Sequence, residues 1–235
     1  MIKIIWLCPF PANLLLPEIN LTRKRNYHSA SWIVNLVWEF SKVKNIDFHV
    51  IFLNAHIARD QTIIKNGITF HVIKRGIKFL NIGYPKWFRI DLYTLFLVDI
   101  IKLRKKINEI NPDIVHSYGS EVPYGITSQF LKYPVIYSIQ GLMKEMSKKY
   151  PMNINYWFMS KIENYILKKN KYFISQSKYV TQYIQKQTKN KIIFETYYAV
   201  NSVFFLKEKA SNIENNIIFL GSINDKNKGF NILLK

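Results

Sequence analysis

Two short apolar segments in the middle of the chain, residues 114–118 and 135–139, constrain the fold more than any other feature. Pro112 cannot continue a helix and disfavours helical backbone angles at Asn111, so a helix ends before this point and a strand begins after it. Both segments are too short and too apolar to be independent helices. They have the character of strands that are buried on both faces, and they therefore predict interior strands of a parallel sheet.

The carboxyl ends of these two strands and the loops that follow them, residues 116–121 and 138–142, carry the candidate site. In open parallel sheets, ligands bind just outside the carboxyl ends of the strands, so these loops are expected to form the floor of a cleft. A structural interpretation stays open beside this one. In it, Gly119 and Gly141 only permit tight turns, and His116 is a buried histidine whose hydrogen bonds are satisfied.

The rest of the chain alternates between strand and helix patterns. Strands are expected at residues 2–7, 48–53, 68–73, 172–176 and 192–200, and helices at residues 29–45, 91–110, 155–168 and 179–186. This alternation predicts right-handed crossovers and an α/β fold with a doubly wound, mostly parallel sheet. A polar stretch, residues 206–216, has the composition of a linker. Residues 217–235 then begin a new strand and helix, which predicts the start of a second domain.

The composition limits the kinds of site and partner. The chain has 34 Lys and Arg against 15 Asp and Glu, a net charge of +19 that would attract nucleic acid, anionic membranes or phosphorylated substrates. The alternative, which we favour slightly, is that the charge reflects only a compositional bias toward Lys, Asn and Ile. Cys8 is the only cysteine, so an intramolecular disulfide is excluded, and no Cys/His spacing suits a metal. No signal peptide or membrane span is predicted, which favours a cytoplasmic location.

The predicted helix at residues 91–110 has a basic side. Its apolar side carries residues such as Leu92, Leu95 and Phe96, and its basic side is formed by Lys102, Arg104, Lys105 and Lys106. An aromatic and basic segment, residues 74–90, precedes it. Such a surface fits a peripheral contact with the anionic inner face of a cell membrane. The alternative is a helix with one side in the core and the other in solvent.

Several motifs in order resemble those of one enzyme family. They are residues 111–116, 135–142, 172–177, 198–204 and 221–229. In this order the chain resembles the retaining family 4 (group 1) glycosyltransferases of the GT-B fold. The resemblance implies two Rossmann-like domains, with residues 1–205 as the acceptor-side domain and residues 217–235 as an incomplete donor domain. It also implies a nucleotide-diphosphate sugar donor, a glycan or lipid-linked acceptor, no cofactor, and a role in surface polysaccharide or lipopolysaccharide biosynthesis.

The resemblance assigns roles to particular residues. The catalytic residues are expected to be His116, Tyr118 and Gln140. The acceptor-binding residues are expected to be Ser120, Glu121 and Gly141, and the donor diphosphate is expected to bind Gly221, Ser222 and Lys228. No metal site is implied.

Some positions depart from the family pattern. Lys228 stands where the family has a Lys, but Ser222 stands where an Arg is usual, so Lys226 or the helix amino terminus would have to replace that contact. A His that is often present at the cleft strands is replaced by Tyr118 and Gln140. The carboxylate pair that grips the donor sugar has no counterpart up to residue 235, which leads us to expect a chain truncated early in the donor domain.

Two other functions compete with glycosyl transfer. A non-catalytic Rossmann-like remnant that binds a phosphorylated ligand would explain Ser222 and the missing carboxylates. A basic nucleic-acid-binding module would explain the net charge of +19 together with the aromatic residues. However, no RNA-binding or DNA-binding motif accompanies the charge, so nucleic acid is not an expected partner.

Overall fold

The structure is a computed structural model that describes residues 1–16, 31–76, 90–120, 122–197, Phe219 and Phe230. The chain divides into two compact units, Met1–Val200 and Asn201–Lys235. In the second unit, the two described rings, those of Phe219 and Phe230, have centroids 4.9 Å apart. The expected linker and the rest of the expected donor-domain start lie outside the described residues.

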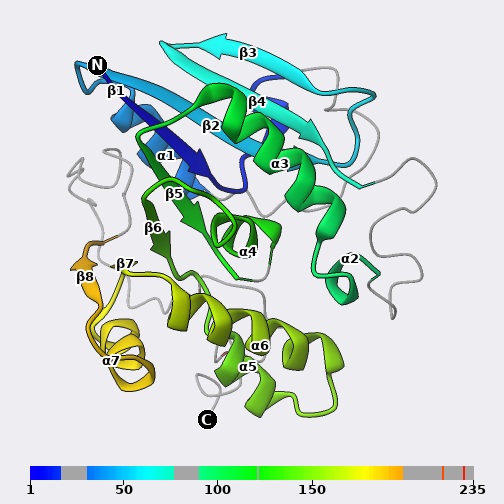
Figure 1. Ribbon diagram of the computed structural model, residues 1–235, viewed down its shortest axis with the longest axis vertical. Coiled ribbons are helices and arrows are strands. Elements are labelled where there is room, and N and C mark those ends of the chain that lie inside the picture. The colour runs from blue at the N-terminus through cyan, green and yellow to red at the C-terminus, as the bar shows by residue number, and fades with distance from the viewer. Residues whose placement is uncertain (17–30, 77–89, 121, 198–218, 220–229, 231–235) are drawn as a thin grey trace, which may run out of the picture. The chain divides into compact units, whose positions relative to one another are not determined.

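The first unit is built on one eight-stranded sheet with the order β3-β4-β2-β1-β5-β6-β7-β8. All neighbouring pairs are parallel except β3 with β4, which confirms the predicted mostly parallel, doubly wound architecture (Figure 1). The strands are β1 (Ile2–Leu7), β2 (Ile46–Asn54), β3 (Gln61–Lys65), β4 (Ile68–Lys74), β5 (Ile114–Tyr118), β6 (Val135–Ser138), β7 (Tyr172–Ser175) and β8 (Ile192–Glu195).

Strand β3 was not predicted from the sequence. It forms a hairpin with β4, in which Lys65 pairs with Ile68 and the two residues between them make the turn. Asn66 and Gly67 have φ angles of 52° and 74°, the left-handed conformations that a tight two-residue hairpin turn requires. The strand lies at the edge of the sheet and is mostly exposed, so its sequence lacks the apolar run that marks an interior strand.

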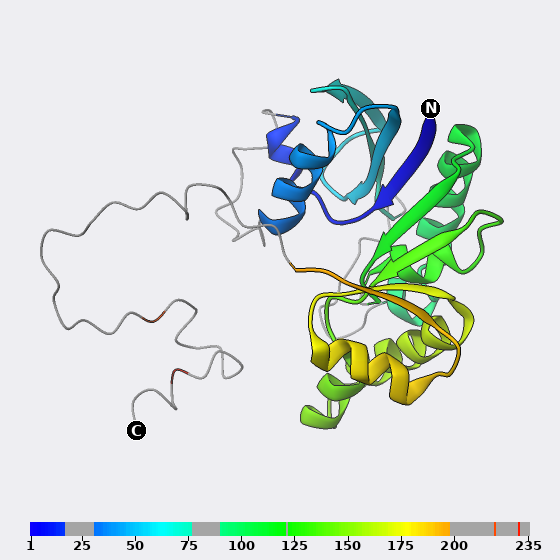
Figure 2. The ribbon, with the colours of Figure 1, turned by 90° about the vertical axis from the view of Figure 1, so that its left-hand side faces the viewer.

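The helices cover the two faces of the sheet unequally. Helix α1 (Ser31–Phe40) lies on one face, and α3 (Leu97–Ile110) lies on the other (Figure 2). On the α3 side, α3 contacts α4, α4 contacts α6, and α6 contacts α7. The remaining helices of the described chain are the short 3₁₀ helix at Ala12–Leu14, α2 (Ile90–Tyr93), α4 (Pro123–Ser128), α5 (Met143–Lys149), α6 (Ile154–Lys169) and α7 (Lys178–Gln187).

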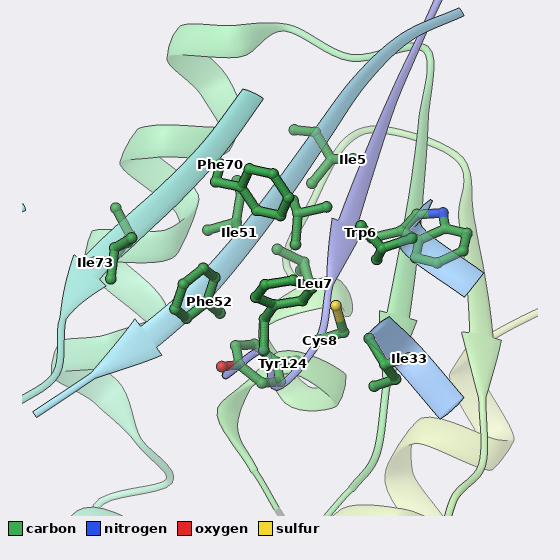
Figure 3. Close-up of a cluster of buried hydrophobic side chains, with 14 of the residues drawn as sticks. Ile5, Trp6, Leu7, Cys8, Ile33, Ile51, Phe52, Phe70, Ile73 and Tyr124 are labelled. Carbon is green, nitrogen blue, oxygen red and sulfur yellow. The ribbon is translucent and has the colours of Figure 1, made fainter. Parts of the chain in front are cut away.

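The core consists of two clusters of buried apolar side chains, one around β1, β2 and β4 and the other around β6, β7 and α6. The larger cluster includes Trp6, Phe52 and Phe70, which meet the apolar side of α1 (Figure 3). The rings of Trp6 and Phe40 lie 5.0 Å apart, so α1 is held to the sheet largely by aromatic contacts. The second cluster lies under α6 and includes Tyr137 and Phe173.

The helix expected at residues 91–110 is divided in the structure. Leu95 and Phe96 have φ angles of 50° and 58°, and these left-handed conformations end α2 before α3 begins. As a result Leu95, which was expected to lie on the apolar side of one helix, is 49% exposed. Helices α4 and α5 were also not predicted, because six or seven residues are too few to show a clear helical period.

Candidate functional site

The carboxyl ends of β5 and β6 lie next to each other and define the candidate site. The two strands are parallel, with Tyr118 opposite Ser138. The amide of Gly119 donates a hydrogen bond of 3.0 Å to the Ser138 carbonyl, and its φ of 78° turns the chain away from the strand. Since Ser120 and Gln140 each follow this paired position by two residues, both occupy the same edge of the sheet, as the sequence predicts.

Two polar atoms at this edge are buried without a partner. The Ser120 hydroxyl oxygen and the Gln140 amide nitrogen have no hydrogen bond in the structure, and Ser120 is only 1% exposed. Most buried polar atoms in proteins are hydrogen-bonded, because an unpaired one costs about 1 to 3 kcal/mol. The hydrogen-bonding capacity of both atoms is therefore unused within the described residues.

His116 and Tyr118 point from β5 toward α1, and their rings pack against each other at a tilt of 33°. Their ring centroids lie 4.2 Å apart, and the Trp6 ring packs edge-on against His116 at 5.3 Å. His116 Nε2 lies 2.7 Å from Ser138 Oγ, which joins β5 to β6 through side chains. Gln140 makes no hydrogen bond to either residue within the described chain. The partnership of His116 with Ser138 was not predicted from the sequence.

Burial keeps His116 and Tyr118 uncharged at neutral pH. Removal from water lowers the pKa of His116 from 6.5 to about 3, because the low-polarity interior disfavours the imidazolium. Burial raises the pKa of the Tyr118 hydroxyl well above its usual 10, and the nearby Cys8 adds to this shift. These two side chains can therefore donate or accept hydrogen bonds, but they offer no positive charge to a phosphate group.

An apolar pocket of about 320 Å³ opens beside this pair. It lies between α1 and the sheet, and its walls are mainly the aromatic and aliphatic side chains of α1, β1, β5, β6 and β7. Its polar side chains include those of His116, Ser138, Gln176 and Thr196. A pocket with such walls and few polar groups suits an apolar or aromatic group whose orientation is set by one or two hydrogen bonds.

The low pKa of His116 makes the protein sensitive to acid. In the unfolded chain the His116 imidazole is protonated below about pH 6.5, whereas in the folded chain it is protonated only below about pH 3. The free energy of unfolding therefore falls as the pH drops through this window. At pH 4.5 the loss is about 3 kcal/mol for this one group. We expect His116→Asn to show a smaller difference in urea stability between pH 7 and pH 4.5 than the unchanged protein.

A residual acid sensitivity should persist in that variant. Burial, with the neighbouring His49, lowers the pKa of His71 from 6.5 to about 4, and this acts in the same direction. The matched control is His56→Asn, at an exposed position, which should keep the full pH dependence. An unchanged slope in His116→Asn would contradict the assignment.

Glu163 holds the segment that follows Gln140 in place, a role that was not predicted from the sequence. It is buried in α6, and its carboxylate accepts hydrogen bonds from the amides of Met143 at 2.7 Å and Lys144 at 3.2 Å. It also accepts one from the Tyr183 hydroxyl of α7 at 2.7 Å. Glu163 thus fixes the start of α5, directly after Gln140 and Gly141. The available signal was an acidic residue among the apolar positions Met159, Ile162, Ile166 and Leu167.

Several predicted site residues lie outside the described part of the chain. These are Glu121 on the acceptor side and Gly221, Ser222 and Lys228 on the donor side. Gly141 is described and half-buried, and a Cβ atom there would meet only the end of the Met143 side chain, at 2.8 Å. Among the described residues, no group of three or more His, Cys, Asp or Glu side chains is placed to hold a metal ion.

The basic side of α3 is less open than its sequence suggests. The Lys102 ammonium donates hydrogen bonds to the Lys74 carbonyl at 2.9 Å and the Gly76 carbonyl at 2.6 Å, so it is committed to the end of β4. Lys106 pairs with Glu109 at 2.6 Å. Arg104 and Lys105 remain exposed. No helix in the ranges that the structure describes has both the length and the hydropathy of a membrane span.

Comparison with known proteins adds a family and a fold. The family described as glycosyl transferase 4-like matches residues 21–177. Sucrose-phosphate synthase from Thermosynechococcus elongatus is similar in structure, with a TM-score of 0.58 at 9% identity over 86% of this chain and 49% of that chain. A second structure of sucrose-phosphate synthase from the same organism gives 0.55 at 9% identity over 85% and 90%.

These structural similarities establish the fold alone, because the sequence identities are low. The chain spans about half the length of the first of these structures, which it covers to 49%. No protein with a curated description matches the sequence.

Proposed function

Because the chain belongs to the glycosyl transferase 4-like family, we propose that it serves to transfer a sugar from a nucleotide-diphosphate sugar to a glycan or lipid-linked acceptor. We propose further that the transfer retains the anomeric configuration and contributes to surface polysaccharide or lipopolysaccharide assembly. In this proposal, residues 1–205 form the acceptor side, and the segment from residue 217 begins the donor side.

The observation that carries the proposal is the pair of unpaired polar atoms at the carboxyl edge of the sheet. Ser120 Oγ and Gln140 Nε2 are buried, uncharged and without hydrogen-bond partners. A hydroxyl oxygen both donates and accepts hydrogen bonds, and an amide nitrogen donates, which together suit the hydroxyl groups of a sugar. These two residues would orient the acceptor without adding charge.

The chemistry requires stabilisation of a leaving diphosphate. An acceptor hydroxyl oxygen bonds to the anomeric carbon, while the bond from that carbon to the phosphate oxygen breaks and its electron pair stays on the diphosphate. The diphosphate takes up the hydroxyl proton on the same face of the sugar. Fixed cations and helix dipoles can stabilise the growing charge, and in this proposal Lys228 supplies one such cation beside Gly221 and Ser222.

Lys228→Ala is expected to weaken the binding of a nucleoside diphosphate by about ten-fold to a hundred-fold, the worth of one charge-assisted hydrogen bond. Isothermal titration calorimetry measures this, and the melting temperature should stay nearly the same. Lys189→Ala is the matched control, because Lys189 is an exposed lysine in the loop between α7 and β8. Equal losses of affinity and melting temperature in Lys228→Ala would instead make Lys228 structural.

The transfer itself can be tested with a panel of nucleotide-diphosphate sugars and lipid-linked saccharide acceptors. We expect one donor to give an acceptor heavier by one sugar and an equal amount of free nucleotide, both followed by mass spectrometry. A protein that binds a nucleotide sugar but releases no nucleotide would favour the non-catalytic binding function, which Ser222 in place of an Arg supports. A protein that binds none of the panel would contradict both functions.

A further inference from the structure

Large apolar side chains are exposed at the turn between α5 and α6. Met152 is 96% exposed, Ile154 is 56% exposed and Trp157 is 48% exposed. The turn is ordered by its own contacts, because the Asn153 side chain caps α6 by accepting a hydrogen bond from the Asn155 amide at 3.1 Å. Single exposed apolar residues are common on proteins, but a cluster of them at an ordered turn marks an interaction surface.

A second group of exposed apolar residues lies close to this turn. Helix α2 contacts α6 (Figure 1). The Tyr93 ring lies 4.9 Å from that of Phe158, and the Tyr93 hydroxyl donates a 3.2 Å hydrogen bond to the Asn155 side chain. Just after this contact, Leu95 is 49% exposed and Leu97 is 57% exposed. We name Leu95, Leu97, Met152, Ile154 and Trp157 the carboxyl-edge patch.

The topology places this patch on the same edge as the candidate site. Helix α3 leads from the carboxyl end of β4 to the amino end of β5, and α6 leads toward the amino end of β7. Both helices therefore begin near the carboxyl edge of the sheet and run back across it. Leu97 and Ile154 are the first residues of these two helices. Ser120 and Gln140 follow strands that end at this same edge.

Lysines and aromatic rings surround the patch. Lys148 and Lys149 precede the turn and are exposed, and the Lys161 ammonium lies 5.1 Å from the centre of the Trp157 ring. Lys149 lies 5.8 Å from the centre of the Tyr150 ring. Trp and Tyr side chains prefer the interface between lipid and water, and lysines beside them attract anionic headgroups.

The geometry points to a membrane-docking surface: the carboxyl-edge patch binds the surface of a bilayer that contains anionic lipids. Met152 and Ile154 enter the boundary between headgroups and acyl chains, Trp157 lies at the interface, and the lysines meet the headgroups. The purpose of docking rests on the proposed function, because it would bring a lipid-linked acceptor to Ser120 and Gln140. The binding itself does not depend on transfer.

The test is co-sedimentation of the whole chain with vesicles of phosphatidylcholine, with or without about one-third phosphatidylglycerol, a composition chosen to raise the anionic surface potential. We expect binding that increases with the anionic lipid and decreases with added salt. Met152→Glu combined with Trp157→Glu should lower the partition coefficient at least ten-fold. Lys149→Glu should lower it at least five-fold in anionic vesicles, since one lysine near the surface contributes about that factor.

Matched controls separate this patch from general charge and exposure. Ile64→Glu changes an apolar residue that is 76% exposed on the edge strand β3, and Lys189→Glu reverses one exposed lysine between α7 and β8. Both should bind vesicles more strongly than the corresponding patch variants. Equal losses in patch and control variants, or binding unaffected by lipid charge, would overturn the proposal. So would the finding that the protein forms dimers which the patch variants disrupt, with vesicle binding unchanged.

The test also distinguishes this inference from the proposed function. Vesicle binding is measured without any sugar donor, so an absence of transferase activity leaves its outcome unaffected. If the function is correct, the Met152 and Trp157 variant should still act on a water-soluble acceptor. Thermal melting should show that the variants remain folded, because the substituted side chains are exposed.

Discussion

Gly125→Ala is expected to lower the free energy of unfolding by about 3 kcal/mol or more, which is the upper end of the usual cost of overpacking. Gly125 lies within α4, and a Cβ atom there would collide with the Gly119 carbonyl oxygen. It would also lie 2.9 Å from the Tyr137 ring and 3.0 Å from the end of Ile166, both of which are fully buried. Because the nearest obstacle is backbone, no change of rotamer can relieve the contact.

Chemical unfolding in urea measures this loss. Gly141→Ala is the matched control, because its new Cβ atom would meet only the flexible end of Met143. That variant should change stability by less than about 1 kcal/mol, as expected where a side chain can move aside. The Gly125 collision also has a local consequence, since a displaced Gly119 would carry Ser120 with it. Similar stabilities for the two variants would show that α4 does not pack as closely as the structure indicates.

Glu163→Ala is expected to destabilise the protein by about 3 to 5 kcal/mol, because it removes a buried acceptor and leaves its donors unpaired. The amides of Met143 and Lys144 and the Tyr183 hydroxyl all donate to this one carboxylate. Their loss would loosen the start of α5 and the contact of α6 with α7. Thermal melting and urea unfolding should both report the change.

Glu145→Ala is the control for Glu163→Ala, since it removes a carboxylate from the neighbouring α5. The partner of Glu145 is Lys148, at 2.8 Å and largely exposed, so the expected loss is below about 1 kcal/mol. The stability loss in Glu163→Gln should lie between those of Glu163→Ala and Glu145→Ala. The amide of Gln keeps one acceptor oxygen, but it cannot accept all three hydrogen bonds. A loss in Glu163→Ala as small as in Glu145→Ala would show that the carboxylate is not needed to hold α5.

The buried interior strands were predictable from local sequence. The apolar runs that became β1, β5 and β6 match their predicted positions closely, since a parallel interior strand must be apolar on both faces. Pro112 correctly marked the end of α3. Strand β3 escaped prediction because an edge strand needs to bury little of its surface. The division between α2 and α3 escaped because left-handed conformations at Leu95 and Phe96 have no sequence signal such as glycine.

The candidate site was likewise predictable only in part. The sequence placed Ser120 and Gln140 at neighbouring strand ends, because strand order and the carboxyl-edge rule require only local patterns. It did not show that His116 pairs with Ser138, or that Glu163 reaches the start of α5. Those contacts join residues about 20 positions apart in the chain. The acceptor-binding role of Ser120 and the catalytic roles of His116 and Gln140 stay predictions.

The amino-acid sequence by itself determined the alternation of strands and helices, and with it the class of fold and the edge of the sheet at which we expect a ligand to bind. Hydrophobic period and the backbone limits of Pro and Gly act over a few residues and are therefore visible in the chain alone. Only the tertiary structure decided which polar groups are buried without partners, how far the pKa of His116 falls, and which apolar residues remain exposed around Met152. Burial and pairing depend on side chains that meet from distant parts of the chain, so only folding brings them about.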